Sequence, residues 1–271
     1  MTRRARRRRD DGWRARSTAP ERMDDPTLDG AELDRTLRQL AWLNRLLGGY
    51  APSVDGVRTV LAAAPGGPPR RATLLDVGTG GADTARRLVR ACARRGIALE
   101  VTAIDHAAAT VAFAQARCRD EPRIRVALAD LFALDPAAGR FDVVHAALVV
   151  HHFHGDEAVR ALAHMYALAE RGVVVNDLHR HRLAYLGIRL ATTLLFRDPM
   201  IRHDGPVSVR RGFTAAELRA LAARAGWPAA TTRLRWRPLF RWQLVVRRPD
   251  APPRPTGPVP PSPPRAAPPA R

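Results

Sequence analysis

The chain has 271 residues, of which 46% are hydrophobic, so it can form one large domain with a sizeable core. The formal net charge is +19 and all 45 basic residues are arginine, a bias typical of GC-rich coding sequences and therefore weak evidence for a nucleic-acid partner. No run of about 18 uncharged apolar residues occurs, and no apolar run follows the N-terminal arginines, which argues against a membrane span and a secretory signal. We expect a cytoplasmic protein whose two cysteines, Cys92 and Cys118, are free and buried, with no metal site.

Composition divides the chain into four segments. Residues 1–22 are rich in arginine and residues 249–271 are rich in proline, so both are predicted to be disordered tails. Residues 23–69 are predicted to be a helical extension, and residues 70–248 a single α/β domain. A start of translation at Met23 is an additional hypothesis.

The extension contains two predicted helices. The first begins at Asp29 or Gly30, carries leucines spaced by three and four residues, and ends at Gly48-Gly49. The second covers Val54–Ala64 and is followed by a proline- and glycine-rich breaker.

A glycine-rich loop follows the extension. Leu74, Leu75 and Val77 form a short apolar run that predicts a strand buried on both faces of a parallel sheet. Gly78, Gly80 and Gly81 come next, and a helical pattern begins at Ala82. A strand, a glycine turn and a helix N-terminus together form a nucleotide-type site, because the backbone can approach a ligand closely there.

Two carboxylates beside this loop indicate which nucleotide it binds. Asp76 precedes the first glycine by two residues, and Asp83 stands where a dinucleotide fingerprint has its last glycine or alanine. Both anions would repel a diphosphate. They favour a ligand with a cationic centre and an amino group, such as S-adenosylmethionine.

Three further strands are predicted, and each ends in polar or ionisable residues. They cover Ile97–Ile104, Ile124–Ala129 and Phe141–Val150. The pairs that begin directly after them are Asp105-His106, Asp130-Leu131 and His151-His152.

With these features the chain resembles the class I S-adenosylmethionine-dependent methyltransferases over about residues 30 to 248. The resemblance implies an α/β, Rossmann-like, doubly wound fold with a seven-stranded, mostly parallel sheet. It also implies S-adenosyl-L-methionine as cofactor. The family's usual third glycine is Ala82 here, with Gly81 beside it. In this family, N-terminal helices often cover the cofactor. The alternative is that the helices of this extension only cover an edge of the sheet.

The resemblance also implies roles for individual residues. In the family the glycine loop, here Asp76, Gly78 and Gly80, cradles the methionine part of the cofactor. The acid ending the second strand, here Asp105, binds the ribose hydroxyls, and the acid ending the third, here Asp130, receives the adenine amino group. The neighbouring residues expected to contact the cofactor are Thr79, His106, Leu131 and Ala146.

After the fourth strand we predict a helix over Asp156–Glu170, a fifth strand over Gly172–Asp177 and a lid insertion over about residues 178–212. Within the insertion, Leu183–Phe196 is apolar almost all round. It is interpreted either as a buried lid helix over an apolar pocket or as an interfacial helix that makes transient contact with a membrane surface.

The last part of the domain is predicted to contain a helix and two antiparallel strands. Thr214 and Glu217 form a capping-box pattern at the start of the helix. The strands are predicted over Thr231–Leu239 and Arg241–Arg247.

Candidate residues for the acceptor side follow the fourth strand. His152 and, after it, His151 are candidate general bases, because open α/β sheets bind ligands at this edge and histidine titrates near neutral pH. A structural or cofactor-contact role for this turn is the alternative. Second-rank candidates are Asn176, Asp177, His179 and His181, while His203-Asp204, before Gly205-Pro206, is predicted to be a loop turn.

Two functions are compatible with these patterns. The first is O- or C-methylation of a small, hydrophobic, oxygen-bearing acceptor, phenolic, polyketide or quinone-like, in secondary metabolism. The second is a nucleic-acid methyltransferase or RNA-binding protein that uses the arginine-rich tails. The first is favoured because the fourth strand lacks the Asn-Pro-Pro-Tyr-like turn and the Pro-Cys pair of nucleic-acid enzymes.

Overall fold

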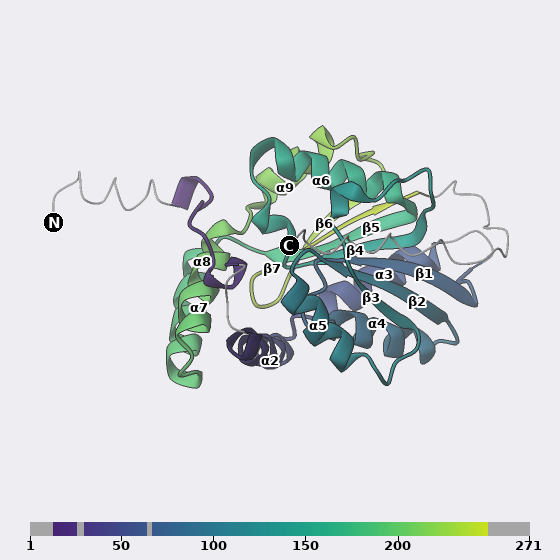
Figure 1. The fold of residues 1–271 in the computed structure, drawn as a ribbon. Coiled ribbons are helices and arrows are strands. Elements are labelled where there is room, and N and C mark those ends of the chain that lie inside the picture. The colour runs from purple at the N-terminus through teal and green to yellow at the C-terminus, as the bar shows by residue number, and fades with distance from the viewer. Residues whose placement is uncertain (1–12, 26–29, 64–66, 249–271) are drawn as a thin grey trace, which may run out of the picture.

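The computed structural model describes residues 13–25, 30–63 and 67–248 (Figure 1). Its centre is a sheet of seven strands: β1 (Arg71–Val77), β2 (Ala98–Asp105), β3 (Ile124–Leu128), β4 (Phe141–Ala147), β5 (Ala169–Leu178), β6 (Thr232–Arg237) and β7 (Arg241–Arg247). The strand order is β3-β2-β1-β4-β5-β7-β6. The first five strands pair in parallel, and β7 runs antiparallel to β5 and β6. The predicted doubly wound, mostly parallel sheet is confirmed.

Helices cover both faces of this sheet (Figure 1). The α-helices are α2 (Gly30–Leu46), α3 (Ala51–Ala62), α4 (Asp83–Ala93), α5 (Ala108–Arg117), α6 (Gly155–Leu168), α7 (Arg182–Leu195), α8 (Pro199–Arg211) and α9 (Ala215–Arg224). Three short 3-10 turns are η1 (Arg22–Asp24), η2 (Leu131–Ala133) and η3 (Val150–His152). Apolar residues of α3, α4 and α5 share one core cluster with the sheet, and those of α6 and α9 share another.

The central strands explain this layering. The residues of β4 are buried from Phe141 through Ala146, and those of β5 from Gly172 through Asp177. Strands that are apolar on both faces need a cover on each side, which the crossover helices provide. At the end of the domain, the Thr214 hydroxyl accepts from the Glu217 amide and the Glu217 carboxylate accepts from the Thr214 amide, so the predicted capping box is confirmed.

Several predicted boundaries differ from the structure. Strand β4 ends at Ala147, three residues before the predicted end, because Leu148 has a φ of 59° and η3 follows. Helix α6 ends at Leu168, and β5 begins at the next residue without a loop. The predicted second helix starts earlier, at Ala51, with a proline in its first turn.

The insertion after β5 consists of two helices, α7 and α8. The prediction that Leu183–Phe196 is a buried helix is wrong, because α7 buries only Thr192 and turns its leucines outward. The prediction of a turn at His203-Asp204 is also wrong. Both residues lie inside α8 despite Pro206, and the buried Asp204 carboxylate accepts hydrogen bonds from the backbone amides of Arg22 and Met23.

These bonds belong to a packed N-terminal segment. The Trp13 ring contacts Tyr185 edge-on, and Glu21 is buried. The prediction of disorder is therefore wrong for residues 13–22, because their polar groups find partners across the domain. Residues 1–12 and the predicted tail 249–271 lie outside the described residues. Among the described helices, none is both long and apolar enough to cross a membrane.

Two glycines offer a matched test of this packing. A Cβ added at Gly172 would lie 2.2 Å from the Val246 carbonyl oxygen, whereas one at Gly187 on exposed α7 would meet nothing within 4 Å. We expect Gly172→Ala to lower the free energy of unfolding by about 1–3 kcal/mol through overpacking. Gly187→Ala should raise it by about 0.5–1 kcal/mol through helix propensity. Chemical denaturation measures both, and equal effects would contradict the described close approach of β5 and β7.

Candidate active site

The glycine loop lies at the carboxyl end of β1 and is open on one side. Gly78 and Gly80 have φ values of 60° and 56°, which side chains rarely adopt. A Cβ at Gly78 would lie 2.5 Å from a methyl group of Val149, so this glycine permits the turn after β4 to pack against the loop. A Cβ at Gly80 would meet nothing within 4 Å. The backbone at Gly80 therefore faces space that a ligand can occupy.

Asp105, at the end of β2, is hydrogen-bonded to this loop. Its Oδ2 accepts from the Gly80 amide at 3.0 Å, and its Oδ1 accepts from the Ala107 amide at 3.2 Å. The side chain remains 10% exposed, and each carboxylate oxygen has a further lone pair. The same carboxylate that fixes Gly80 can thus accept hydrogen bonds from a ligand.

Asp76, which was predicted to cradle the methionine part of the cofactor, is more buried than Asp105. It is buried, its Oδ1 lies 2.7 Å from His145 Nδ1, and its Oδ2 accepts from the Thr79 hydroxyl at 2.7 Å. Each of its oxygens has one partner inside the protein, and Asp76 anchors the loop through Thr79. His145 was missed by the sequence analysis. Its signal is a histidine inside an apolar strand that pairs in register with Asp76.

The other predicted cofactor residues surround the same edge. Asp130 is exposed and caps η2 by accepting from the Phe132 amide at 3.0 Å, while Leu131 is buried in the core. Ala146 is buried and pairs with Val77 of β1. The His106 side chain is 82% exposed, 3.7 Å from Asp105.

Asp83 lies on the helix that follows the loop. Its Oδ1 is 2.6 Å from Arg117 Nη2, so the charge proposed to repel a diphosphate is already paired. Burial raises the pKa of the Asp83 carboxyl, although nearby arginines oppose the rise.

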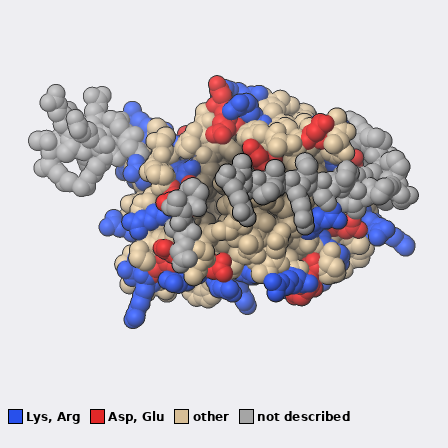
Figure 2. All heavy atoms as spheres, in the orientation of Figure 1, with Lys and Arg blue, Asp and Glu red and all other residues tan. Residues whose placement is uncertain are grey.

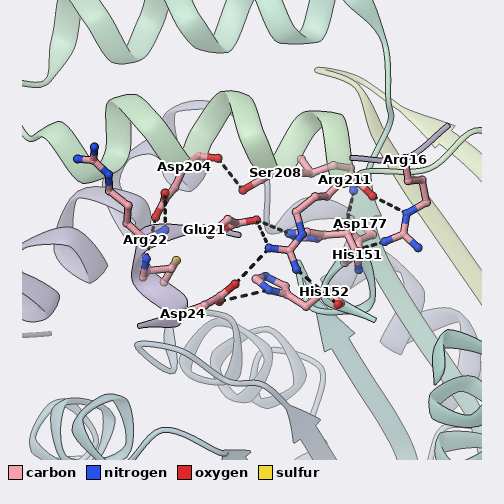
Figure 3. A network of polar contacts seen from close by, with 12 residues as sticks. Arg16, Glu21, Arg22, Asp24, His151, His152, Asp177, Asp204, Ser208 and Arg211 are labelled. Atoms are coloured by element: carbon pink, nitrogen blue, oxygen red, sulfur yellow. Dashed lines mark hydrogen bonds and ion pairs between the residues drawn. The ribbon is translucent and has the colours of Figure 1, made fainter. Parts of the chain in front are cut away.

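The turn after β4 carries the two candidate histidines (Figure 3). His151 is buried, its Nδ1 lies 2.7 Å from Asp177 Oδ1, and its Nε2 lies 3.5 Å from Glu21 Oε1. Burial by itself lowers the pKa of His151, but Asp177 and Glu21 together raise it to about 9. At neutral pH the ring is therefore an imidazolium, and it has no lone pair with which to act as a base.

His152 is positioned differently. Its side chain is 29% exposed, and its Nδ1 lies 3.4 Å from Asp24 Oδ1 (Figure 3). Burial raises the pKa of Asp24, but His152 and Arg211 outweigh it and bring the pKa to about 2. An ionised carboxylate beside one ring nitrogen favours a proton on that nitrogen. Asp24 can therefore orient the His152 ring through Nδ1.

Two arginines complete this cluster. Arg211 Nη1 lies 3.5 Å from Glu21 Oε1 and 3.1 Å from Asp24 Oδ2. Arg16 donates to the carbonyl oxygens of His151, Phe153 and Arg211 at 2.5–2.9 Å and lies over the Phe213 ring. The N-terminal segment is thereby tied to both the histidine turn and α8.

Glu21, His151 and His152 each offer one possible metal-ligand atom, and these three atoms lie within 4.8 Å of one another. That spacing is close enough for shared coordination of a metal ion. Arg211, however, already places a positive charge on Glu21 and Asp24. A fixed cation at this point opposes binding of a divalent ion. The geometry therefore favours a hydrogen-bonded charge network.

The comparisons with known proteins agree with this geometry. Residues 74–172, from the glycine loop strand to the start of the buried part of β5, match the family model described as a methyltransferase domain. The matched segment is a methyltransferase domain, and the chain has the fold of the class I S-adenosylmethionine-dependent methyltransferases. No curated protein matches its sequence.

Solved methyltransferases share the fold at low sequence identity. The plantazolicin methyltransferase BpumL in complex with SAH has 10% identity and a TM-score of 0.59, with 79% of this chain and 89% of that chain covered. An O-methyltransferase family protein from Burkholderia thailandensis has 16% identity, a TM-score of 0.58 and coverage of 89% and 67%. A SAM-dependent methyltransferase from Aquifex aeolicus has 15% identity, a TM-score of 0.55 and coverage of 82% and 99%.

The residues of this methyltransferase fit its cofactor, S-adenosylmethionine. Gly80 faces open space, and Asp105 and Asp130 end adjacent strands with oxygens still able to accept hydrogen bonds. Asp76 contributes indirectly, because it fixes Thr79 of the loop. The turn that carries His151 and His152 packs against this loop at one point, where Val149 lies against Gly78.

A substitution at Asp105 tests the cofactor side. If Asp105 binds a ribose diol, its truncation removes charged hydrogen bonds and the anchor of Gly80, which should cost roughly 2–4 kcal/mol. Asp105→Ala should therefore weaken S-adenosylmethionine binding about 30-fold or more in calorimetry. Asp156→Ala, at an exposed aspartate on α6, is the control and should change nothing. A loss below about threefold at Asp105 would mean that the ribose is held elsewhere.

Proposed function

We propose that this methyltransferase methylates a small, apolar, oxygen-bearing acceptor of phenolic, polyketide or quinone-like type. The observation that carries the proposal is the His152–Asp24 pair beside the cofactor loop, where a partly exposed imidazole is paired with an ionised carboxylate. A hydroxyl acceptor gains from such a base, because an oxyanion attacks far better than a neutral hydroxyl.

In the proposed reaction the bound cofactor supplies a methyl group activated by a positive sulfur. Asp105, Asp130 and the Gly78–Gly80 backbone would hold the cofactor, and Asp76 and His145 keep the loop in place. Asp24 orients His152, which takes the proton from the acceptor hydroxyl. His151, as a buried imidazolium, positions the turn and takes no proton.

The surroundings of His152 support a small acceptor. The N-terminal segment and α8 cover one side of the histidine turn through Glu21, Arg211 and Arg16, as expected for a site that admits a small acceptor. One structural neighbour is named an O-methyltransferase family protein, and BpumL is described in complex with desmethylPZN analogues. The alternative to methylation of an acceptor oxygen is methylation of an electron-rich carbon of the same kind of acceptor.

The nucleic-acid alternative has less support. On the face shown in Figure 2, arginines are distributed around the outline and interspersed with carboxylates rather than gathered into one stripe. Nucleic-acid enzymes usually present a continuous basic surface. Incubation of the protein with a cell extract and labelled S-adenosylmethionine distinguishes a small-molecule acceptor from a nucleic acid. Label in an organic-soluble small molecule supports the proposal, and label in RNA or DNA overturns it.

His152 can then be tested with the identified acceptor. His152→Gln should lower kcat about 10²–10⁴-fold, the usual contribution of a general base, with cofactor affinity unchanged. Asp24→Asn should lower kcat less and alter the pH dependence of kcat, because the orienting charge is lost. Arg219→Gln, at an exposed arginine on α9, is the control. If His152→Gln keeps more than about a third of the wild-type kcat, this histidine is no general base.

A further inference from the structure

Helix α7 presents an apolar stripe to the outside of the molecule. Leu183, Leu186, Leu190 and Leu194 recur every three or four residues, and they are 61%, 57%, 61% and 72% exposed. The residues therefore share one helix face, and that face points away from the domain. Figure 1 shows α7 at the outer edge of the fold, away from the sheet.

The apolar surface continues beyond this stripe. Leu195 is 51% exposed, and Phe196, the next residue, packs edge-on against Trp42 of α2, which is itself 49% exposed. A contiguous exposed surface of leucines and a tryptophan normally marks an interaction site, because its hydration is unfavourable. We call the four leucines, Leu195 and Trp42 the α7 surface.

The charges around the α7 surface are positive. Residues 182–197 contain Arg182, Arg189 and Arg197 and no acidic residue, and all three arginines are exposed. The next acidic residue, Asp198, is buried and caps α8. Exposed Arg202 adds to this side. Basic side chains also project at the edge of Figure 2 where Figure 1 places α7.

We propose that the α7 surface docks on an anionic lipid bilayer. An apolar stripe flanked by arginines is the pattern of a helix that lies in the membrane interface, with its leucines among the acyl chains and its arginines on lipid phosphates. A second copy of the chain fits less well, because facing two such surfaces would bring Arg189 and Arg197 of both copies together. With 14 residues, α7 lies on a bilayer and does not cross it.

Docking here would place the acceptor side of the enzyme near the membrane. Helix α7 packs on α8, which holds the N-terminal segment through Asp204 and Arg211. A lipid-soluble acceptor would then reach His152 from the bilayer, a consequence that rests on the proposed function. The docking itself does not, so it is tested without any acceptor.

The test is co-flotation of the full chain with phosphatidylcholine vesicles, with and without about 30% phosphatidylglycerol. We expect binding to the anionic vesicles that weakens with salt and with removal of phosphatidylglycerol. Leu186→Glu with Leu190→Glu should weaken binding at least about tenfold. Leu239→Glu is the matched control, since Leu239 is 52% exposed and lies on the turn between β6 and β7. It should bind like the wild type.

The arginines are tested in the same way. Each arginine at a bilayer surface contributes on the order of a fivefold change in binding, so Arg189→Gln with Arg197→Gln should cost about 25-fold. The control is Arg94→Gln with Arg219→Gln, which removes one exposed arginine at the end of α4 and one on α9. Unchanged cofactor binding in each variant verifies the fold.

Three results would overturn the proposal. The first is that the chain does not bind the vesicles. The second is that the variant with Leu186→Glu and Leu190→Glu binds as well as the wild type, which would assign vesicle binding to arginines elsewhere in the chain. The third is a concentration-dependent dimer that Leu190→Glu abolishes, which would make a second copy the occupant of the α7 surface.

Discussion

The buried imidazolium of His151 is the interaction on which the candidate site depends. It lies between the carboxylates of Asp177 and Glu21, so it joins the end of β4, the end of β5 and the N-terminal segment at one point. A buried charge is tolerated only where partners compensate it. Here three carboxylates, Glu21, Asp24 and Asp177, face the cations of His151, Arg211 and Arg16. Asp24 belongs to the same network, and the partly exposed His152 lies next to its ionised carboxylate.

The cofactor side is organised by a second buried pair, Asp76 and His145, on adjacent strands. This pair fixes Thr79, and Asp105 fixes Gly80, so two carboxylates hold one loop from two strands. The histidine turn then packs on this loop through Val149 and Gly78. The chemistry proposed for His152 would then take place near a loop that carboxylates of two strands hold, and fixed geometry is what alignment of an acceptor with a methyl group requires.

The sequence predicted features that depend on residues close together in the chain, and it missed contacts between residues far apart. The strand and glycine turn from Leu74 to Gly80 were predicted from the local pattern, and the resemblance to the methyltransferases then implied roles for the acids Asp105 and Asp130. The family and the sheet follow from the same features. The role of Asp76 was not predictable, because it depends on His145, which is 69 residues away and adjacent only through strand pairing.

The N-terminal segment and the insertion show the limit of such patterns. Residues 13–22 look like a solvated tail by composition, yet Arg16 and Glu21 are held by residues far along the chain. Glu21, Asp24 and Asp25, acidic residues that follow an arginine-rich stretch, were the available signal. In the insertion, the apolar pattern of α7 was recognised, but period and composition do not tell whether a leucine face turns toward the core or away from it.

The pH dependence of stability tests the central claim most directly. A pKa of His151 raised from 6.5 to about 9 corresponds to roughly 3 kcal/mol of stability that is fully present below pH 6.5 and lost as pH rises through 9. The free energy of unfolding should therefore fall across this window, and fall clearly less in Glu21→Gln, where one of the two carboxylates that raise this pKa is neutral. A wild-type curve that stays flat between pH 6.5 and 9, or an unchanged fall in Glu21→Gln, would contradict the account.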